Sequence, residues 1–156
     1  MFRELRRKER ALSAEEAEKI LKDCVYGVLS LQGDDGYPYG VPMNYGYSHG
    51  KIYLHGVVNK GHRMDSIRRS PKVCFTVISK HELVAEAFQM RYESVIVFGT
   101  IRVIEDPEEK KEAMRRLVAS YISGYEKETD EHCVKTEKAL AMFEITPEHI
   151  TGKAGT

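Results

Sequence analysis

The stretch YESVIVFGTIRVIED, residues 92–106, is the longest β-strand signal in the chain. β-Branched residues dominate it, and such residues favour strands. Gly99 interrupts it, which indicates a bulge or a bend. Asp106 then precedes Pro107 and Glu109, a pattern typical of a helix that Asp106 caps. Core packing accounts for the apolar centre of this stretch, but less well for the polar cluster of residues 91–94 at its start.

Five further strand signals surround this stretch in hairpin order. They cover residues 25–32, 37–47, 51–56, 72–79 and a final strand that begins near residue 141. Pro38 and Pro42 place the second of these at an edge or a bend, because proline donates no ladder hydrogen bond. Residues 12–23 are expected to be helical, with Ser13 and Glu16 as a capping box. Further helices are expected over residues 108–122 and, in a polar segment, 127–140, whereas residues 80–90 read as a connector.

Six antiparallel strands with flanking helices predict a small β-barrel of the α+β class. With 156 residues, no internal repeat and no linker, we expect one domain spanning residues 1–156. Its expected ends are a helical N-terminal arm, residues 1–23, and a loose C-terminal tail, residues 151–156.

Composition narrows the function classes. The chain carries 24 Lys and Arg against 24 Asp and Glu, so its formal charge is zero, which gives no overall attraction to nucleic acid or to an anionic membrane. Three cysteines without CxxC spacing indicate reduced thiols. The charged N-terminus is not that of a signal peptide, and no apolar run approaches the roughly 20 residues of a membrane span. We therefore expect a cytoplasmic protein without nucleic-acid or membrane partners.

The segment NKGHR, residues 59–63, concentrates cations at a strand-to-helix junction. Gly61 allows close backbone approach, and the first turn of the following helix offers free N–H groups and a positive dipole end. Lys60, His62 and Arg63 add side-chain donors, so the segment is a candidate phosphate cradle. The other interpretation is a solvated basic surface. The spacing is not that of a Walker motif, which argues against an NTPase.

His55 is the second candidate. Strand alternation places Ile52 and Leu54 on one face, and Tyr53 and His55 on the other. An imidazole at this point could exchange a proton near neutral pH, or could simply be a structural histidine. No metal site is predicted, because the histidines lack metal-ligand spacing.

Three ordered stretches carry a family resemblance: GYPYGVPMNYGY, IYLHGVVNKGHRMDSIRRSPKVCFTV and RYESVIVFGTIRVIEDPEEK. With them, from about Arg6 to Thr151, the chain resembles the nitroimidazole-resistance (Nim) family, within the broader pyridoxamine 5'-phosphate oxidase-like FMN-binding split-barrel proteins. The resemblance implies a six-stranded antiparallel split β-barrel that forms a homodimer, with FMN at the interface.

By the same resemblance, FMN phosphate would lie at Lys60, Gly61, His62 and Arg63. The ribityl chain and ring would pass Val41, Pro42, Met43 and Asn44, and then His55 and Gly56. The partner chain would supply residues around Tyr92, Glu93, Ser94 and Val95. His55 matches the active-site histidine of some Nim proteins and is the candidate catalytic residue.

The resulting functional hypothesis is an FMN-dependent oxidoreductase that reduces a small electron-poor acceptor such as a nitro-aromatic compound. The arginines with which pyridoxamine phosphate oxidase itself binds its substrate's phosphate have no match here, so vitamin B6 oxidation is not implied. Two alternatives stay open: a non-catalytic flavin store or redox sensor, and a haem-binding split barrel with His55 or His62 as axial ligand. Some related split barrels bind a deazaflavin, but the basic cradle favours the compact phosphate of FMN.

Overall fold

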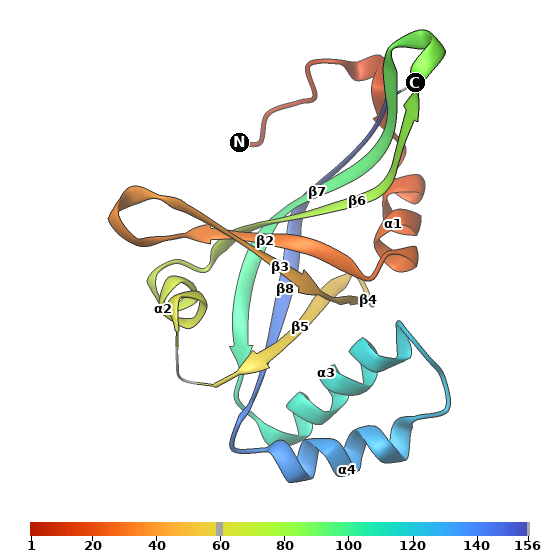
Figure 1. Cartoon of the computed structure of the whole chain (residues 1–156). Coiled ribbons are helices and arrows are strands. Elements are labelled where there is room, and N and C mark those ends of the chain that lie inside the picture. The colour runs from red at the N-terminus through yellow and green to blue at the C-terminus, as the bar shows by residue number, and fades with distance from the viewer. Residues whose placement is uncertain (59–60, 156) are drawn as a thin grey trace.

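The computed structural model describes residues 1–58 and 61–155 of the chain. In this part of the chain it contains eight β-strands, four α-helices and three short 3-10 turns (Figure 1). In chain order they are η1 (Lys8–Arg10), β1 (Ala11–Leu12), α1 (Ala14–Asp23), β2 (Tyr26–Gln32), η2 (Asp34–Gly36), β3 (Pro38–Asn44), β4 (Gly46–Ser48), β5 (Lys51–Val57), α2 (His62–Arg69), β6 (Lys72–Val84), η3 (Ala85–Ala87), β7 (Gln89–Ile104), α3 (Pro107–Ala119), α4 (Glu126–Thr136) and β8 (Leu140–Gly155).

All eight strands belong to one antiparallel sheet. Their order is β3-β2-β6-β7-β8-β5-β4, and β1 pairs with β8. The outermost strands β3 and β4 are joined through the single residue Tyr45, so the sheet curls into a barrel. β3 and β5 are not hydrogen-bonded neighbours, and the barrel therefore stays open between them. We call this gap, bounded by Met43 on β3 and Gly56 on β5, the split.

The α+β class and the split-barrel architecture are confirmed, but the expected strand number is wrong. The additional strands are β1, with two residues, and β4, with three. The single bent strand expected over residues 37–47 is divided at Tyr45, whose buried side chain donates a hydrogen bond to the Leu21 carbonyl at 2.9 Å. Two residues are too short a run to show as alternation in a sequence.

Two hydrophobic clusters stabilise the fold. The main core fills the barrel, and α1 and α2 add apolar side chains to it, including Leu21 and Ile67. The second cluster lies on the outer side of β5, β7 and β8, where α3 covers Tyr53, Ile104 and Met142. Figure 1 shows α3 and α4 packed side by side below this part of the sheet. Residues on opposite faces of β5 therefore belong to different environments.

Both expected helix starts are present. Ser13 Oγ accepts a hydrogen bond from the Glu16 N–H at 3.2 Å, and Glu16 in return accepts one from the Ser13 N–H at 2.7 Å. Asp106 accepts one from the Glu109 N–H at 2.8 Å. Each cap satisfies N–H groups that have no partner inside the helix. Among the helices described, none is long and apolar enough to cross a membrane.

Three expectations for the chain ends and the connector need correction. The tail expected to be loose forms the end of β8 as far as Gly155, because β7 pairs with it along residues 92–104. Within the N-terminal arm, the α-helix covers only Ala14–Asp23. The connector over residues 80–90 continues the β6–β7 ladder. We call its projecting part, residues 79–91, the arm; it is the green hairpin in Figure 1.

Candidate functional site

The first turn of α2 forms one wall of the candidate site. Gly61 precedes the helix with φ of 94° and ψ of 163°, a conformation that favours glycine. No described side chain caps this end, so the first-turn N–H groups are available to an anion. Lys60, assigned to the same cradle, lies outside the described residues.

Arg63 reaches from α2 into the split. Its Nη1 lies 3.7 Å from Met43 Sδ, and its Cζ lies 5.5 Å from the centre of the Phe143 ring. On the other side the guanidinium rests on Gly56, where an added Cβ would meet Nη2 at 2.0 Å. A side chain at position 56 would therefore displace the guanidinium.

The guanidinium of Arg63 has no acidic partner among the described residues. Its Nε is buried without a hydrogen bond, and none of the described carboxylates forms an ion pair with it. A half-buried cation without a counter-ion is unusual, because the loss of hydration is normally offset by pairing. The arrangement suits a bound anion at the split.

His62 points in another direction. Its ring stacks on Tyr39 with centroids 3.9 Å apart and planes inclined by 13°. Its Nε2 lies 3.5 Å from the Asp34 carboxylate, without hydrogen-bond geometry. The side chain of His62 thus packs on the β2–β3 hairpin. His62 therefore contributes only its backbone to the anion site at the start of α2.

His55 lies on the outer face of β5, opposite the face that carries Gly56. Ile52 and Leu54 belong to the main core and Tyr53 to the second cluster, so the predicted alternation is confirmed. Nδ1 of His55 is buried without a hydrogen-bond partner. Burial, followed by the charges of Arg63 and His132, lowers the pKa of His55 below its ordinary value of 6.5. The imidazole is therefore neutral at neutral pH.

The four residues expected along the flavin from β3 divide between two faces. Met43 is buried in the core and contacts Arg63 from inside. Val41 packs partly against the same core. Pro42 and Asn44 alternate with them along β3 and face outward. Pro42, Asn44 and His55 are thus the outward-facing groups near the split.

Within one chain, residues 92–95 do not reach the split. They lie at the base of the arm, where Tyr92 is 3.5 Å from Arg10 Nη1. Glu93 accepts a hydrogen bond from Ser79 at 3.2 Å, and Val95 is fully buried in the core. Ser94 is half-buried on the outer face. Tyr92, Glu93 and Ser94 could reach a flavin at the split only from a second copy, whereas the side chain of Val95 is enclosed by its own core.

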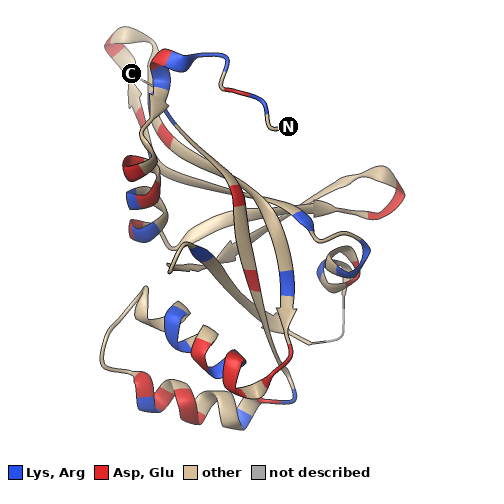
Figure 2. Ribbon diagram, turned by 180° about the vertical axis from the view of Figure 1, so that it is seen from behind, with Lys and Arg blue, Asp and Glu red and all other residues tan. Residues whose placement is uncertain are grey.

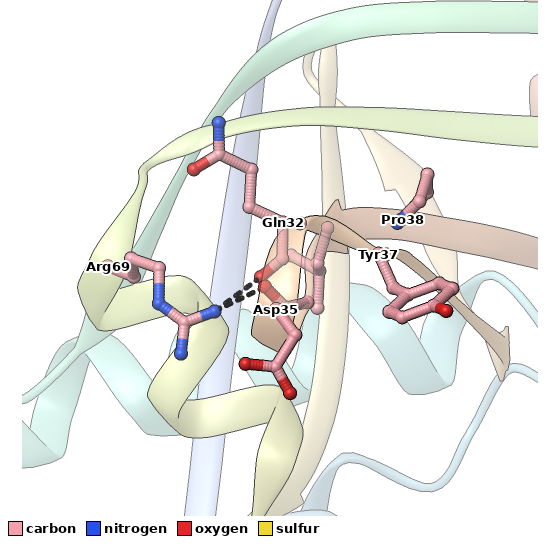
Figure 3. A pocket seen from close by; sticks show the side chains of 8 residues that line it. Gln32, Asp35, Tyr37, Pro38 and Arg69 are labelled. Carbon is pink, nitrogen blue, oxygen red and sulfur yellow. Dashed lines mark hydrogen bonds between the residues drawn. The ribbon is translucent and has the colours of Figure 1, made fainter.

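A hollow of about 500 Å³ lies beside α2 at the β2–β3 hairpin (Figure 3). Arg69 lines one side of it and donates hydrogen bonds to the carbonyls of Gln32, at 3.2 Å, and Gly33, at 2.6 Å. His55, Gly56 and Arg63 do not line this hollow. Arg69 holds the hairpin against α2, a role that its place in a run of basic residues did not reveal.

Comparison with known proteins identifies the family. A family model described as pyridoxamine 5'-phosphate oxidase matches residues 13–154. The chain belongs to this family. No protein with a curated description matches it.

Several solved structures share the fold. A candidate 5-nitroimidazole antibiotic resistance protein from Bacteroides thetaiotaomicron is 25% identical, with a TM-score of 0.77 over 92% of this chain and 86% of that one. An FAD-binding protein from Mesorhizobium loti is also 25% identical, with a TM-score of 0.69 over 94% and 98%. A flavocytochrome from Azotobacter vinelandii, at 22% identity, has a TM-score of 0.83 over 98% and 72%, and this likeness concerns the fold alone. The resemblance inferred from the sequence motifs is confirmed.

Proposed function

We propose that this chain is a cytoplasmic FMN-dependent oxidoreductase that reduces a small electron-poor acceptor, such as a nitro-aromatic compound. The observation that carries the proposal is the half-buried guanidinium of Arg63, which has no acidic partner among the described residues. Family membership and the similarity to a candidate nitroimidazole-resistance protein and an FAD-binding protein support a flavin as the ligand.

The residues at the split fit the phosphate of FMN. Arg63 and the free N–H groups at the start of α2 would bind it, together with Lys60, since charge-assisted hydrogen bonds to phosphate are among the strongest in proteins. FMN, when bound, would supply the two-electron chemistry. Pro42 and Asn44 would orient the ring at the outer side of the split.

His55 would act on the acceptor. A neutral imidazole can donate a hydrogen bond, or can pass on a proton after taking one from water. The lowered pKa of His55 holds it in this form, and its unpartnered Nδ1 leaves a polar atom free for a ligand. These two features support the proposed role of His55 in proton transfer to the acceptor.

A second copy of the chain would complete the site. On the outer face, β2, β6 and β7 expose large apolar side chains, among them Tyr26 at 68%, Ile78 at 64% and Phe98 at 40%. We call this area the bare face. Apolar surface of this kind commonly marks an interface, and twofold pairing is the commonest assembly. A homodimer would bury the bare face and bring Tyr92, Glu93 and Ser94 of one copy to the split of the other.

Titration with FMN and with riboflavin tests the phosphate assignment. Arg63→Gln should weaken FMN about tenfold or more while leaving riboflavin, which lacks the phosphate, nearly unchanged. Lys135→Gln on α4 removes the same charge from an exposed position and is the matched control. Flavin fluorescence gives the affinities. Equal loss of FMN and riboflavin affinity in Arg63→Gln, or no loss of either, would contradict the assignment.

Turnover separates an enzyme from a flavin store or sensor, which would need the same binding site. Reduced protein-bound FMN should be reoxidised faster when a nitro-aromatic acceptor is added under anaerobic conditions. A reoxidation rate that does not depend on the acceptor would favour the storage or sensing role.

A further inference from the structure

Two cations lie beside the side chain of Tyr92 at the base of the arm. Arg10 Nη1 lies 3.5 Å from Tyr92 Oη, and Lys153 Nζ lies 5.6 Å from the centre of the Tyr92 ring. The three residues come from the end of η1, from β7 and from β8. Figure 2 shows the basic N-terminal segment beside the C-terminal end of β8, where β1 pairs with it. We call these three residues the Tyr92 cluster.

The Tyr92 cluster has an excess of positive charge. Neither Arg10 nor Lys153 forms an ion pair with a carboxylate in the part of the chain that the structure describes. The adjacent acid, Glu93, points to the other face of β7, where it accepts a hydrogen bond from Ser79. Lys153 and then Arg10 lower the pKa of Tyr92, because both stabilise the phenolate. All three side chains are half-buried and keep access to solvent.

The Tyr92 cluster shares a face with the proposed interface. Ser94 pairs with Lys153 on one side and with Ile78 on the other, and paired residues of an antiparallel ladder project to the same face. Tyr92 lies two residues from Ser94 and so projects with it. The cluster therefore continues the bare face toward the arm.

We propose that the Tyr92 cluster is an anion-binding site that takes the carboxylate or phosphate group of the acceptor, with Arg10 and Lys153 supplying the charge and Tyr92 a hydroxyl donor. Its position beside a flavin rests on the proposed function, because only a second copy would bring it to the split. Anion binding by the cluster does not depend on the flavin. Arg63 and the start of α2 remain the site of the FMN phosphate, and the Tyr92 cluster selects the acceptor.

The binding test compares two nitro-aromatic acceptors that differ in charge. We would titrate the ¹⁵N-labelled full-length protein with 4-nitrobenzoate and with 4-nitrobenzamide at low ionic strength, and follow the amides of Gly152 and Gly155. The wild type should bind the benzoate about tenfold more tightly than the benzamide, since each exposed cation contributes up to about fivefold. Arg10→Gln and Lys153→Gln should each reduce this preference severalfold, and the double variant should abolish it.

Lys135→Gln, which removes an equal charge from α4, should leave the preference unchanged. Equal affinities for the two compounds in the wild type, or a preference that survives in the double variant, would overturn the proposal. In steady-state assays the same substitutions should raise KM for the benzoate and not for the benzamide. If neither compound is turned over, the proposed oxidoreductase function fails, while the titration still decides whether the Tyr92 cluster binds anions.

Discussion

Replacing Gly56 by alanine tests the geometry of the split without removing any charged group. A Cβ at position 56 would lie 2.0 Å from Arg63 Nη2 and 2.9 Å from its Cζ, but 3.4 Å from the nearest atom of Phe143. The flexible side chain of Arg63 can move away from the added Cβ, whereas the ring of Phe143 needs to shift little. Gly56→Ala should therefore expel the guanidinium from the split and leave the barrel intact.

The expected magnitudes follow from the contacts. Loss of one charge-assisted hydrogen bond to the phosphate costs about 1.5–3 kcal/mol, which weakens FMN roughly 10- to 150-fold. For stability, loss of the contact between Arg63 and Phe143 costs about 0.5–1 kcal/mol. Alanine also lowers the conformational entropy of the unfolded chain, which stabilises the folded state by a similar amount and offsets this loss. The free energy of unfolding should change by less than about 1 kcal/mol.

Flavin fluorescence and urea denaturation measure the two quantities on the same samples. Gly40→Ala on β3 is the control, because its Cβ would meet only Val28 Cγ1, at 3.4 Å. The double variant Gly56→Ala/Arg63→Gln should bind FMN no more weakly than Arg63→Gln alone, since both changes remove the same interaction. Full FMN affinity in Gly56→Ala, or additive losses in the double variant, would show that the Arg63 guanidinium does not bind the FMN phosphate in the split.

Three further predictions concern His55 and Glu144. His55→Gln should leave flavin reduction intact but slow reoxidation by a nitro-aromatic acceptor about 100- to 10,000-fold in stopped-flow, and equal rates across pH 5–8 would make His55 structural. The pKa of His55 is lowered in the folded state, so the contribution of the neutral imidazole to stability is present above about pH 6.5 and is lost as the pH falls. The urea denaturation midpoint should therefore fall less on acidification in His55→Gln than in the wild type. Parallel pH curves of the two proteins would contradict this prediction. Glu144 is buried and accepts hydrogen bonds from Lys51 and Arg102, both at 2.9 Å, so Glu144→Gln should lower the free energy of unfolding by about 1–3 kcal/mol. Glu148→Gln is the control and should lower it by less than about 1 kcal/mol, because the ion pair of Glu148 with Lys72 is exposed. Equal effects of the two substitutions would contradict a role for burial.

The local features of the fold were predictable because they depend on neighbours in sequence. Ser13 with Glu16, and Asp106 with Pro107, mark helix starts through side chains only a few residues apart. The alternation of Leu54 and His55 followed from strand geometry alone. The polar connector near residue 85 was not predictable as a ladder, because its hydrogen bonds come from pairing between β6 and β7.

Only those residues of the candidate site that lie within one sequence motif were predictable. The junction after β5 identified Arg63, but the burial of its guanidinium between Met43 and Gly56 depends on tertiary packing. The same limit explains why Arg10 and Lys153 were missed. They are separated by more than 140 positions, and they meet at Tyr92 because β8 pairs with both β1 and β7.

The absorption spectrum of the purified full-length protein, after reconstitution with FMN and removal of free ligand by gel filtration, tests flavin binding most directly. We expect flavin bands that coelute with the protein at one FMN per chain, and loss of most of this flavin in Arg63→Gln. Protein that elutes without flavin bands, or that retains a haem Soret band in their place, would contradict flavin binding at the split.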